Sequence, residues 1–494
     1  MWRRINGRLL QLSLAVLTLA SWSEGIVASV QAEDWPQFRG AHCSGLSTSD
    51  LPLPVEVSPD ANVIWKTQIS AGHSSPILFQ NRVYLTIADG DKLATVALDR
   101  ATGKTIWEAV APHDMLEEIH QTGSRAQSTP ATDGQIVVSF FGSSGLLAYD
   151  VDGHLLWSQR MGPFKNDFGA GSSPIIANDY VILVQDHDVD SFIAAYDKRT
   201  GKEVWKVDRD EFTRNYATPV IWEVAGKRQI VVAATLRIVG YDLETGEEVW
   251  TVRGVSRIVN MSPIIGPDNV LYAACFSPGN DSESRLIPPS VDEIFASDTN
   301  QNGTVEESEF PNNDFKHRFA QLDRNKDGSI SRSEYVSVIR SHTEGQNVFL
   351  AIAPGGQGDI TKTHVRWEQT KQLPYCPSPL YYEGKLYMIK NGGIFSVLDA
   401  KTGKVLKHTR LKATGDYYAS PVAGDGKIYL LNQKGELTVV AANQGWQELH
   451  SFDFGGDGHA TPAVADGRLY LRVGDELYCF GLTKPKSASS GSTD

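Results

Sequence analysis

Two twelve-residue stretches of the sequence place oxygen-bearing side chains at alternate positions. They are "DTNQNGTVEESE" at residues 298–309 and "DRNKDGSISRSE" at residues 323–334. Positions 1, 3 and 5 are acidic or amide residues, position 7 carries a hydroxyl and position 12 is glutamate. Such side chains converge on one hard cation, together with the position 7 carbonyl and both glutamate oxygens. The predicted metal ligands are Asp298, Asn300, Asn302, Thr304, Glu309, Asp323, Asn325, Asp327, Ser329 and Glu334.

The residues around these ligands favour a pair of calcium loops over two solvated acidic turns. Gly303 and Gly328 allow the sharp turn at position 6, and Val305 and Ile330 stand where two such loops join through a short β-contact. The tandem pattern resembles an EF-hand pair, which implies about two bound calcium ions. Only 13 residues separate the loops and Pro311 is among them, so the helices between them must be short. Outside a cell, we expect weak affinity, of order 10⁻⁴–10⁻³ M.

A strand-like repeat surrounds the two loops. A Ser-Pro or Thr-Pro dipeptide begins eight similar segments, at Pro76, Pro130, Pro174, Pro219, Pro263, Pro379, Pro421 and Pro462. Each segment predicts two short strands, a third strand that ends in Asp, a tight turn with Gly, and a fourth strand with Trp, as in "AYDKRTGKEVW" (195–205). Four strands at a period near 44 residues indicate an all-β fold, an eight-bladed β-propeller with a small α-helical insertion that carries the calcium loops.

The two ends of the chain are predicted to close this ring. "NVIWKTQI" (62–69) carries the Trp strand but precedes the first proline, and the last segment has only three strands. We therefore expect the N-terminal strand to complete the last blade, which removes two exposed edges.

The Ala-x-Asp-x-x-Thr-Gly-x-x-x-Trp pattern resembles the tryptophan-docking repeat of quinoprotein alcohol dehydrogenases and their PQQ-like relatives. The leader "EDWPQFRGAHCSG" (33–45) is similar to the start of secreted bacterial PQQ-like proteins. Blades six and seven depart from the pattern, since we expect Lys407 and Leu449 at the Trp position. The same repeat builds the propeller subunit of the outer-membrane barrel assembly machinery, so the repeat implies the fold and leaves the cofactor open.

The expected organisation follows from these segments. It is a signal peptide at 1–32, a leader at 33–60, propeller blades with the closing strand at 61–280, the EF-hand pair at 281–346, further blades at 347–482 and a disordered tail at 483–494. Because the insertion joins a second strand to a third, it should stand on the face that carries the channel mouth.

The ends and the charge of the chain indicate an exported protein. Three arginines precede a short apolar run, and Val30 and Ala32 offer a cleavage site near Ala32, so we predict a secreted or periplasmic location. No later segment is apolar for long enough to span a membrane. A formal net charge of −13 disfavours nucleic-acid binding. Four widely spaced cysteines favour buried thiols over a disulfide framework.

The residue three before each repeat proline should lie at the channel mouth. These positions predict a ligand-binding ring of His73, Gln127, Tyr216, Asn260, Tyr418 and His459, together with Gly171 and Cys376. The alternative is that these polar residues only line a wet channel.

The favoured function is binding or scaffolding, with a protein or glycan partner on the mouth face. The first alternative is a periplasmic PQQ-dependent dehydrogenase of alcohols or sugars, and the second is an outer-membrane assembly factor. The resemblance implies that a quinone would need an axial calcium held by carboxylate and amide groups, a catalytic Asp, a Trp floor and often adjacent cysteines. The predicted ring has no carboxylate and the chain has no adjacent cysteines, so PQQ is possible but not favoured, and no catalytic residue is predicted. The sequence leaves the oligomeric state open.

Overall fold

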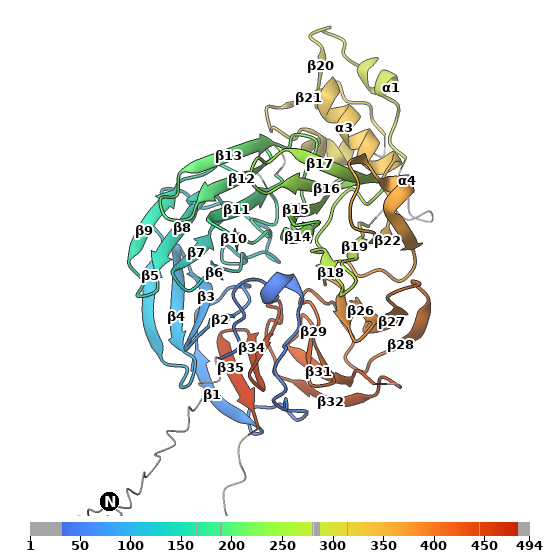
Figure 1. The fold of residues 1–494 in the computed structure, drawn as a ribbon. Helices are drawn as coiled ribbons and strands as arrows, with labels where there is room; N and C mark the ends of the chain where they lie inside the picture. Colours follow the sequence, from blue (N-terminus) through green and yellow to red (C-terminus); the bar gives the residue numbers. More distant parts are fainter. Residues whose placement is uncertain are drawn as a thin grey trace, which may run out of the picture. The chain divides into compact units, whose positions relative to one another are not determined.

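Eight antiparallel sheets follow one another around a central axis in the computed structural model (Figure 1). The structure describes residues 32–482, except residues 165, 188–189, 279, 281–286, 314 and 444. The sheets confirm the predicted eight-bladed β-propeller. The predicted signal peptide, apart from Ala32, and the predicted tail at 483–494 lie outside the described residues.

The first four blades are built from consecutive strands. Blade one contains β2 (Ile77–Phe79), β3 (Arg82–Asp89), β4 (Lys92–Asp99) and β5 (Thr105–Val110). Blade two contains β6 (Ala131–Thr132), β7 (Ile136–Phe140), β8 (Leu146–Asp150) and β9 (Leu155–Gln159). Blade three contains β10 (Ile175–Ala177), β11 (Tyr180–Gln185), β12 (Phe192–Asp197) and β13 (Glu203–Asp208). Blade four contains β14 (Val220–Val224), β15 (Lys227–Ala234), β16 (Arg237–Asp242) and β17 (Glu248–Arg253), to which the short β23 (Gly358–Asp359) adds in parallel.

The last four blades carry the insertion and the closure. Blade five contains β18 (Ile264–Ile265), β19 (Leu271–Cys275), β22 (Val348–Ile352) and β24 (Val365–Gln369). Blade six contains β25 (Leu380–Tyr382), β26 (Lys385–Lys390), β27 (Ile394–Asp399) and β28 (Val405–Arg410). Blade seven contains β29 (Val422–Gly424), β30 (Lys427–Leu431), β31 (Glu436–Ala441) and β32 (Glu448–Asp453). Blade eight contains β33 (Ala463–Ala465), β34 (Arg468–Val473), β35 (Glu476–Gly481) and β1 (Val63–Gln68). Shorter elements are η1 (Ala41–Cys43), η2 (Gly142–Ser144) and α4 (Thr361–His364).

The Thr-Gly turns and the outer-strand tryptophans fit together between neighbouring blades. The indole nitrogen of Trp157 in β9 donates to the Lys198 carbonyl of blade three at 2.9 Å. Gly201 of the same turn has φ +70°, and a Cβ there would lie 2.6 Å from the Trp157 ring. Glycine is therefore required both for the turn and for close approach of the indole. This contact explains why Thr-Gly and Trp recur together in the sequence.

The register of two blades shows what replaces tryptophan. Lys407 pairs with Val397 at the expected Trp position of blade six. In blade seven His450 pairs with Val439 at that position, so the prediction of Leu449 there was wrong by one residue. The cause is the length of the turn before β32, which the sequence pattern alone does not fix. His450 uses its ring nitrogen to contact the Val57 carbonyl at 3.0 Å.

The ring closes between blades eight and one. Strand β1 pairs antiparallel with β35, with Trp65 opposite Cys479. The Trp65 indole donates to the carbonyl of Arg100 in blade one at 3.0 Å. The Arg100 guanidinium donates to Asp466 of blade eight at 2.9 Å. The buried Arg472 of β34 donates to the Thr86 carbonyl of β3 at 2.9 Å. We call these contacts the seam.

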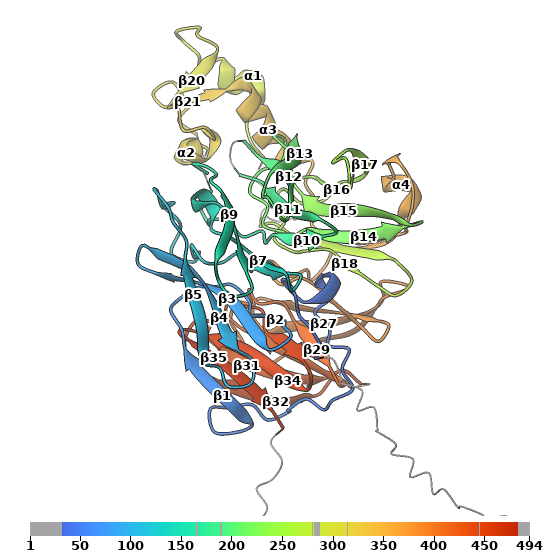
Figure 2. The same cartoon turned by 60° about the vertical axis from the view of Figure 1, so that its left-hand side comes forward.

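The insertion lies between β19 and β22, which pair as the second and third strands of blade five. It contains α1 (Val291–Phe295), β20 (Thr304–Glu306), η3 (Lys316–Arg318), α2 (Phe319–Leu322), β21 (Ser329–Ser331) and α3 (Arg332–Thr343). These elements form one group in Figure 2 and enclose their own apolar core, which includes Ile294, Val305, Phe319, Ile330 and Tyr335. Among the helices described, none has the length and apolar character needed to cross a membrane.

Candidate functional site at the calcium loops and the channel mouth

The two predicted calcium loops, residues 298–309 and 323–334, have the same local geometry. Asp298 accepts the backbone N–H of Gly303 at 3.0 Å, and Asp323 accepts that of Gly328 at 2.9 Å. Both glycines have positive φ, at +88° and +91°, and a Cβ would meet nothing within 4 Å. The positive φ alone therefore explains glycine at this position. Glu309 and Glu334 turn back to the start of their own loops.

The loops join through a short antiparallel ladder. Val305 lies opposite Ile330 in the β20–β21 pair, and both side chains are buried. Only a short turn follows the first loop, and η3 and α2 are short, as the spacing and Pro311 imply. The structure thus brings the five predicted ligands of each loop into one hairpin-linked unit.

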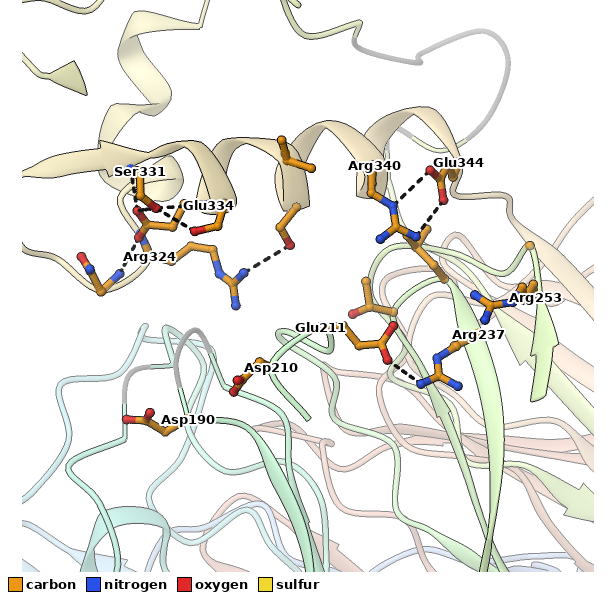
Figure 3. A pocket seen from close by; sticks show the side chains of 17 residues that line it. Asp190, Asp210, Glu211, Arg237, Arg253, Arg324, Ser331, Glu334, Arg340 and Glu344 are labelled. Carbon is orange, nitrogen blue, oxygen red and sulfur yellow. Dashed lines mark hydrogen bonds and ion pairs between the residues drawn. The ribbon is translucent and has the colours of Figure 1, made fainter. Parts of the chain in front are cut away.

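The second loop faces the propeller across a cleft of about 810 Å³, which we call the α3 cleft (Figure 3). Asn325 and Glu334 of this loop line it on one side, and Glu211 and Arg237 of the propeller line it on the other. Arg237 forms an ion pair with Glu211. The charged lining differs from the mostly apolar lining of small-molecule pockets.

Helix α3 also fastens the insertion to the propeller near the mouth. His342 lies 3.1 Å from a guanidinium nitrogen of Arg257. Phe315 and Arg318 of the insertion share a small cavity with Arg214 and Ile258, and the latter two also line the channel mouth. The calcium loops therefore belong to a module that abuts the mouth.

All eight residues predicted at the mouth converge on one cavity of about 260 Å³. They come from the loops that feed the first strand of each blade. Gln127 donates to the Phe168 carbonyl at 2.7 Å, and the Tyr216 hydroxyl donates to Asn166 at 2.7 Å. Asn260 donates to the Tyr375 carbonyl at 3.3 Å. These bonds hold the ring residues in place.

The N-terminal leader forms the floor of this cavity. Phe38 lines the cavity, and the adjacent Arg39 is fully buried. Trp35 exchanges backbone hydrogen bonds with Leu78 of blade one, while Arg39 donates to the Pro379 carbonyl of blade six at 2.8 Å. Figure 1 shows the blue turn η1 near the centre of the ring. The mouth is thus a cup with an aromatic floor, which we call the mouth cup.

A ring of hydroxyl groups lines the cup and was not predicted. It consists of Ser75, Thr129, Ser173, Thr218, Ser262, Ser378, Ser420 and Thr461. From Ser75 to Ser420 each backbone N–H donates to the hydroxyl of the next blade at 2.9–3.1 Å, and Thr461 accepts the last of these bonds. The signal was present, because these are the residues before the repeat prolines, where a hydroxyl recurs in every blade.

Two histidines of the ring lie against each other. The rings of His73 and His459 stack with centroids 4.0 Å apart and planes 9° apart, and Tyr418 lies next to His459. Burial, with His459 and Arg472 nearby, lowers the pKa of His73 to about 3. Burial also lowers the pKa of His459, against the opposing effect of Asp457. Both imidazoles are therefore neutral at pH 7.

The cup does not provide what a quinone cofactor requires. None of the described residues that line it is a carboxylate or a tryptophan, and Arg214 is its only guanidinium. Cys376 is the cysteine in the lining, and burial raises the pKa of its thiol to about 12. Hydroxyl and imidazole groups around a phenyl floor do not fit a quinone held by an axial calcium.

Comparisons with known proteins agree with the repeat and with the second of the two loops. A family model described as outer membrane protein assembly factor BamB matches residues 48–185 and 92–278, and an EF-hand model matches residues 315–339. No curated protein matches the sequence.

Solved structures are similar to the chain at low sequence identity. BamB from Moraxella catarrhalis is 14% identical with a TM-score of 0.52, covering 85% of this chain and 99% of that one. The computationally designed Ika8 protein is 12% identical with a TM-score of 0.51, covering 85% and 100%. A europium-containing methanol dehydrogenase is 12% identical with a TM-score of 0.43, covering 91% and 98%. The chain therefore carries PQQ-like repeats on an eight-bladed β-propeller, into which a segment with an EF-hand match is inserted.

Proposed function

We propose that this chain is an exported calcium-binding propeller that acts as a binding or scaffold protein, with a protein partner over the mouth cup. The observation that carries the proposal is the convergence of eight ring residues on a cup closed from below by Phe38, with the EF-hand module against its rim. A ring of hydroxyl, amide, imidazole and phenol groups around an aromatic floor offers hydrogen bonds and apolar contact together. The protein partner class is supported by the BamB family match.

Calcium would occupy two sites, one in each loop. Each loop carries a carboxylate at positions 1 and 12 and an amide or carboxylate at positions 3 and 5, and both have the backbone geometry described above. The second site would influence the mouth more than the first, because Asn325 and Glu334 line the α3 cleft and α3 continues to the contact between His342 and Arg257.

Site-specific photocrosslinking in cells tests the proposal. A photoreactive residue at Gln127 or Tyr418 places the probe in the mouth cup, and one at Arg199, whose side chain is 75% exposed in the β12–β13 turn, serves as a control on a turn outside the cup. We expect a discrete, calcium-dependent protein adduct from the mouth positions alone. Equal labelling from Arg199, or no adduct from the mouth, contradicts a docking function. Adducts that are lost on glycosidase treatment would instead indicate a glycan partner.

A quinone titration tests the enzyme alternative directly. Residues 33–494 would be titrated with PQQ in calcium by calorimetry, followed by dye-linked oxidation of alcohols and sugars. Since the cup lacks carboxylates and an indole floor, we expect no stoichiometric binding and no turnover. Stoichiometric PQQ binding with turnover would replace the scaffold proposal by a dehydrogenase.

A further inference from the structure

We propose that His73, Asp457 and His459 form a binding site for a divalent first-row transition metal at the rim of the mouth cup. One ligand atom from each residue lies within 4.8 Å of the others. Two imidazoles and one carboxylate are a donor set that suits zinc and its neighbours rather than calcium, which prefers oxygen. The site is distinct from the calcium loops and goes beyond the proposed docking function.

The two ring nitrogens of His459 indicate that this side chain binds a group other than the described residues. Both are buried and have no hydrogen-bond partner among the described residues. Buried polar atoms in native proteins are nearly always satisfied, so each exception requires a reason. The ring of His73 stacks against His459 and the ring of Tyr418 lies tilted beside it, and neither bonds to its ring nitrogens. A metal bound to one of these nitrogens supplies the absent interaction.

The backbone holds the ligands of both blades in position. His73 precedes β2, and its N–H donates to the Ala126 carbonyl at 2.9 Å. Asp457 and His459 flank Gly458, whose N–H donates to the Gln433 carbonyl at 2.9 Å. A Cβ at Gly458 would lie 2.1 Å from the Asn432 carbonyl oxygen, so glycine allows this segment to pack closely. Anchored ligands lose little conformational freedom when a metal binds.

Three protein ligands would leave a fourth coordination position on a tetrahedral metal. Both histidines line the mouth cup, while Asp457 is exposed. Three protein ligands with a fourth position open to solvent or to a bound molecule is the arrangement of catalytic rather than structural zinc sites. A metal here would offer a coordination bond to a donor atom of whatever occupies the cup.

Calorimetry with Zn²⁺ tests the site. The protein would be residues 33–494 without a histidine tag, stripped with chelator and kept in saturating Ca²⁺ so that the calcium loops are filled. We expect one Zn²⁺ per chain, and Co²⁺ should give the intense visible absorption of a low-coordinate nitrogen and oxygen site. His73→Gln, His459→Gln and Asp457→Asn should each weaken binding by at least about 10-fold, since a change even in an outer partner of a metal ligand typically costs 10–100-fold.

His154→Gln is the matched control, because His154 also contacts a carboxylate, that of Asp150, but is exposed and belongs to no three-ligand cluster among the described residues. It should leave Zn²⁺ binding unchanged. Thermal unfolding of each variant without Zn²⁺ separates ligand loss from misfolding. Absence of stoichiometric binding, or equal binding by His459→Gln and the parent, overturns the inference. Zn²⁺ binding and partner crosslinking are independent readouts, so the failure of one leaves the other intact.

Discussion

The backbone nitrogen of Glu33 lies 3.0 Å from each carboxylate oxygen of Asp466. The Arg100 guanidinium donates to the same carboxylate at 2.9 Å, and the Glu33 carboxylate accepts the Asp466 backbone N–H at 3.1 Å. Removal of a signal peptide before Glu33 would turn this nitrogen from an amide into an α-ammonium group. The new positive charge would then face Asp466 directly, and the cleavage itself would strengthen the seam.

The first prediction concerns this charge. Asp466→Asn should lower the free energy of unfolding of a protein that begins at Glu33 by about 2 kcal/mol, because charged hydrogen bonds contribute about 1.5–3 kcal/mol. A Gly-Ser extension before Glu33 should also lower the melting temperature, but only in the parent and not in Asp466→Asn. Chemical unfolding of the four proteins measures this coupling. An extension that destabilises both backgrounds equally excludes the proposed ion pair.

The second prediction concerns the calcium loops. Glu309→Gln and Glu334→Gln should each remove one Ca²⁺ from the stoichiometry measured by calorimetry, because each glutamate supplies both of its oxygens to one ion. Glu307→Gln, a neighbour that is not a predicted ligand, is the control. Saturating calcium at about ten times the dissociation constant should stabilise each site by about 1.4 kcal/mol. Two ions retained by either variant would disprove the assignment of its loop.

The third prediction concerns the Trp–Gly contact. Gly201→Ala should destabilise the protein by several kcal/mol, since its Cβ would lie 2.6 Å from the Trp157 ring in addition to the strain of φ +70°. Gly384→Ala isolates the strain alone, because φ there is +78° and nothing lies within 4 Å of the added Cβ. It should cost about 1–2 kcal/mol. Similar losses measured by denaturant unfolding would mean that indole packing contributes nothing.

The fourth prediction concerns the pH dependence of stability. His187 is 1% exposed, stacks on Phe164 at 4.0 Å, and burial lowers its pKa to about 3. The unfolded chain therefore binds more protons than the folded chain between pH 6.5 and about 3, and stability falls as the pH falls through this range. From pH 6.5 to 4.5 the loss should be about 2–3 kcal/mol.

His187→Gln should flatten that slope whatever its effect on stability at pH 7. His154→Gln is a control of opposite sign, because Asp150 raises the pKa of this exposed histidine, whose contribution is lost as the pH rises. Urea unfolding at several pH values measures both slopes. An unchanged slope in His187→Gln means that this histidine does not titrate on unfolding.

The sequence predicts the elements that repeat, and it misses several contacts that occur only once. Pro, Thr-Gly and Trp recur in register, so the eight blades follow from period and turn chemistry. The shift from Leu449 to His450 follows from one turn of unusual length, which local patterning does not encode. The leader was expected only to precede the ring, yet Phe38 forms the floor of the cup. Such contacts join distant segments and leave no local periodicity.

In the candidate site too, local spacing predicts some residues, while the contacts of others depend on the closed ring. The ten calcium ligands follow from spacing within each loop and stay a prediction until ions are measured. The mouth positions converge because each stands at the same offset from its proline. His73 stacks on His459, and Asp457 lies near both histidines, only because the ring closes. No residue spacing in the sequence therefore predicts these contacts.

The pairing of β1 with β35 joins segments from opposite ends of the chain. During synthesis β1 exists long before its partner, and until β35 arrives it presents an unpaired edge that other chains can add to. The ring can therefore close only in a chain that includes β35, since a chain truncated before β35 cannot cover that edge. Because contacts of such long range form slowly, we expect the unclosed ring to be the species with the longest-lived exposed strand edge.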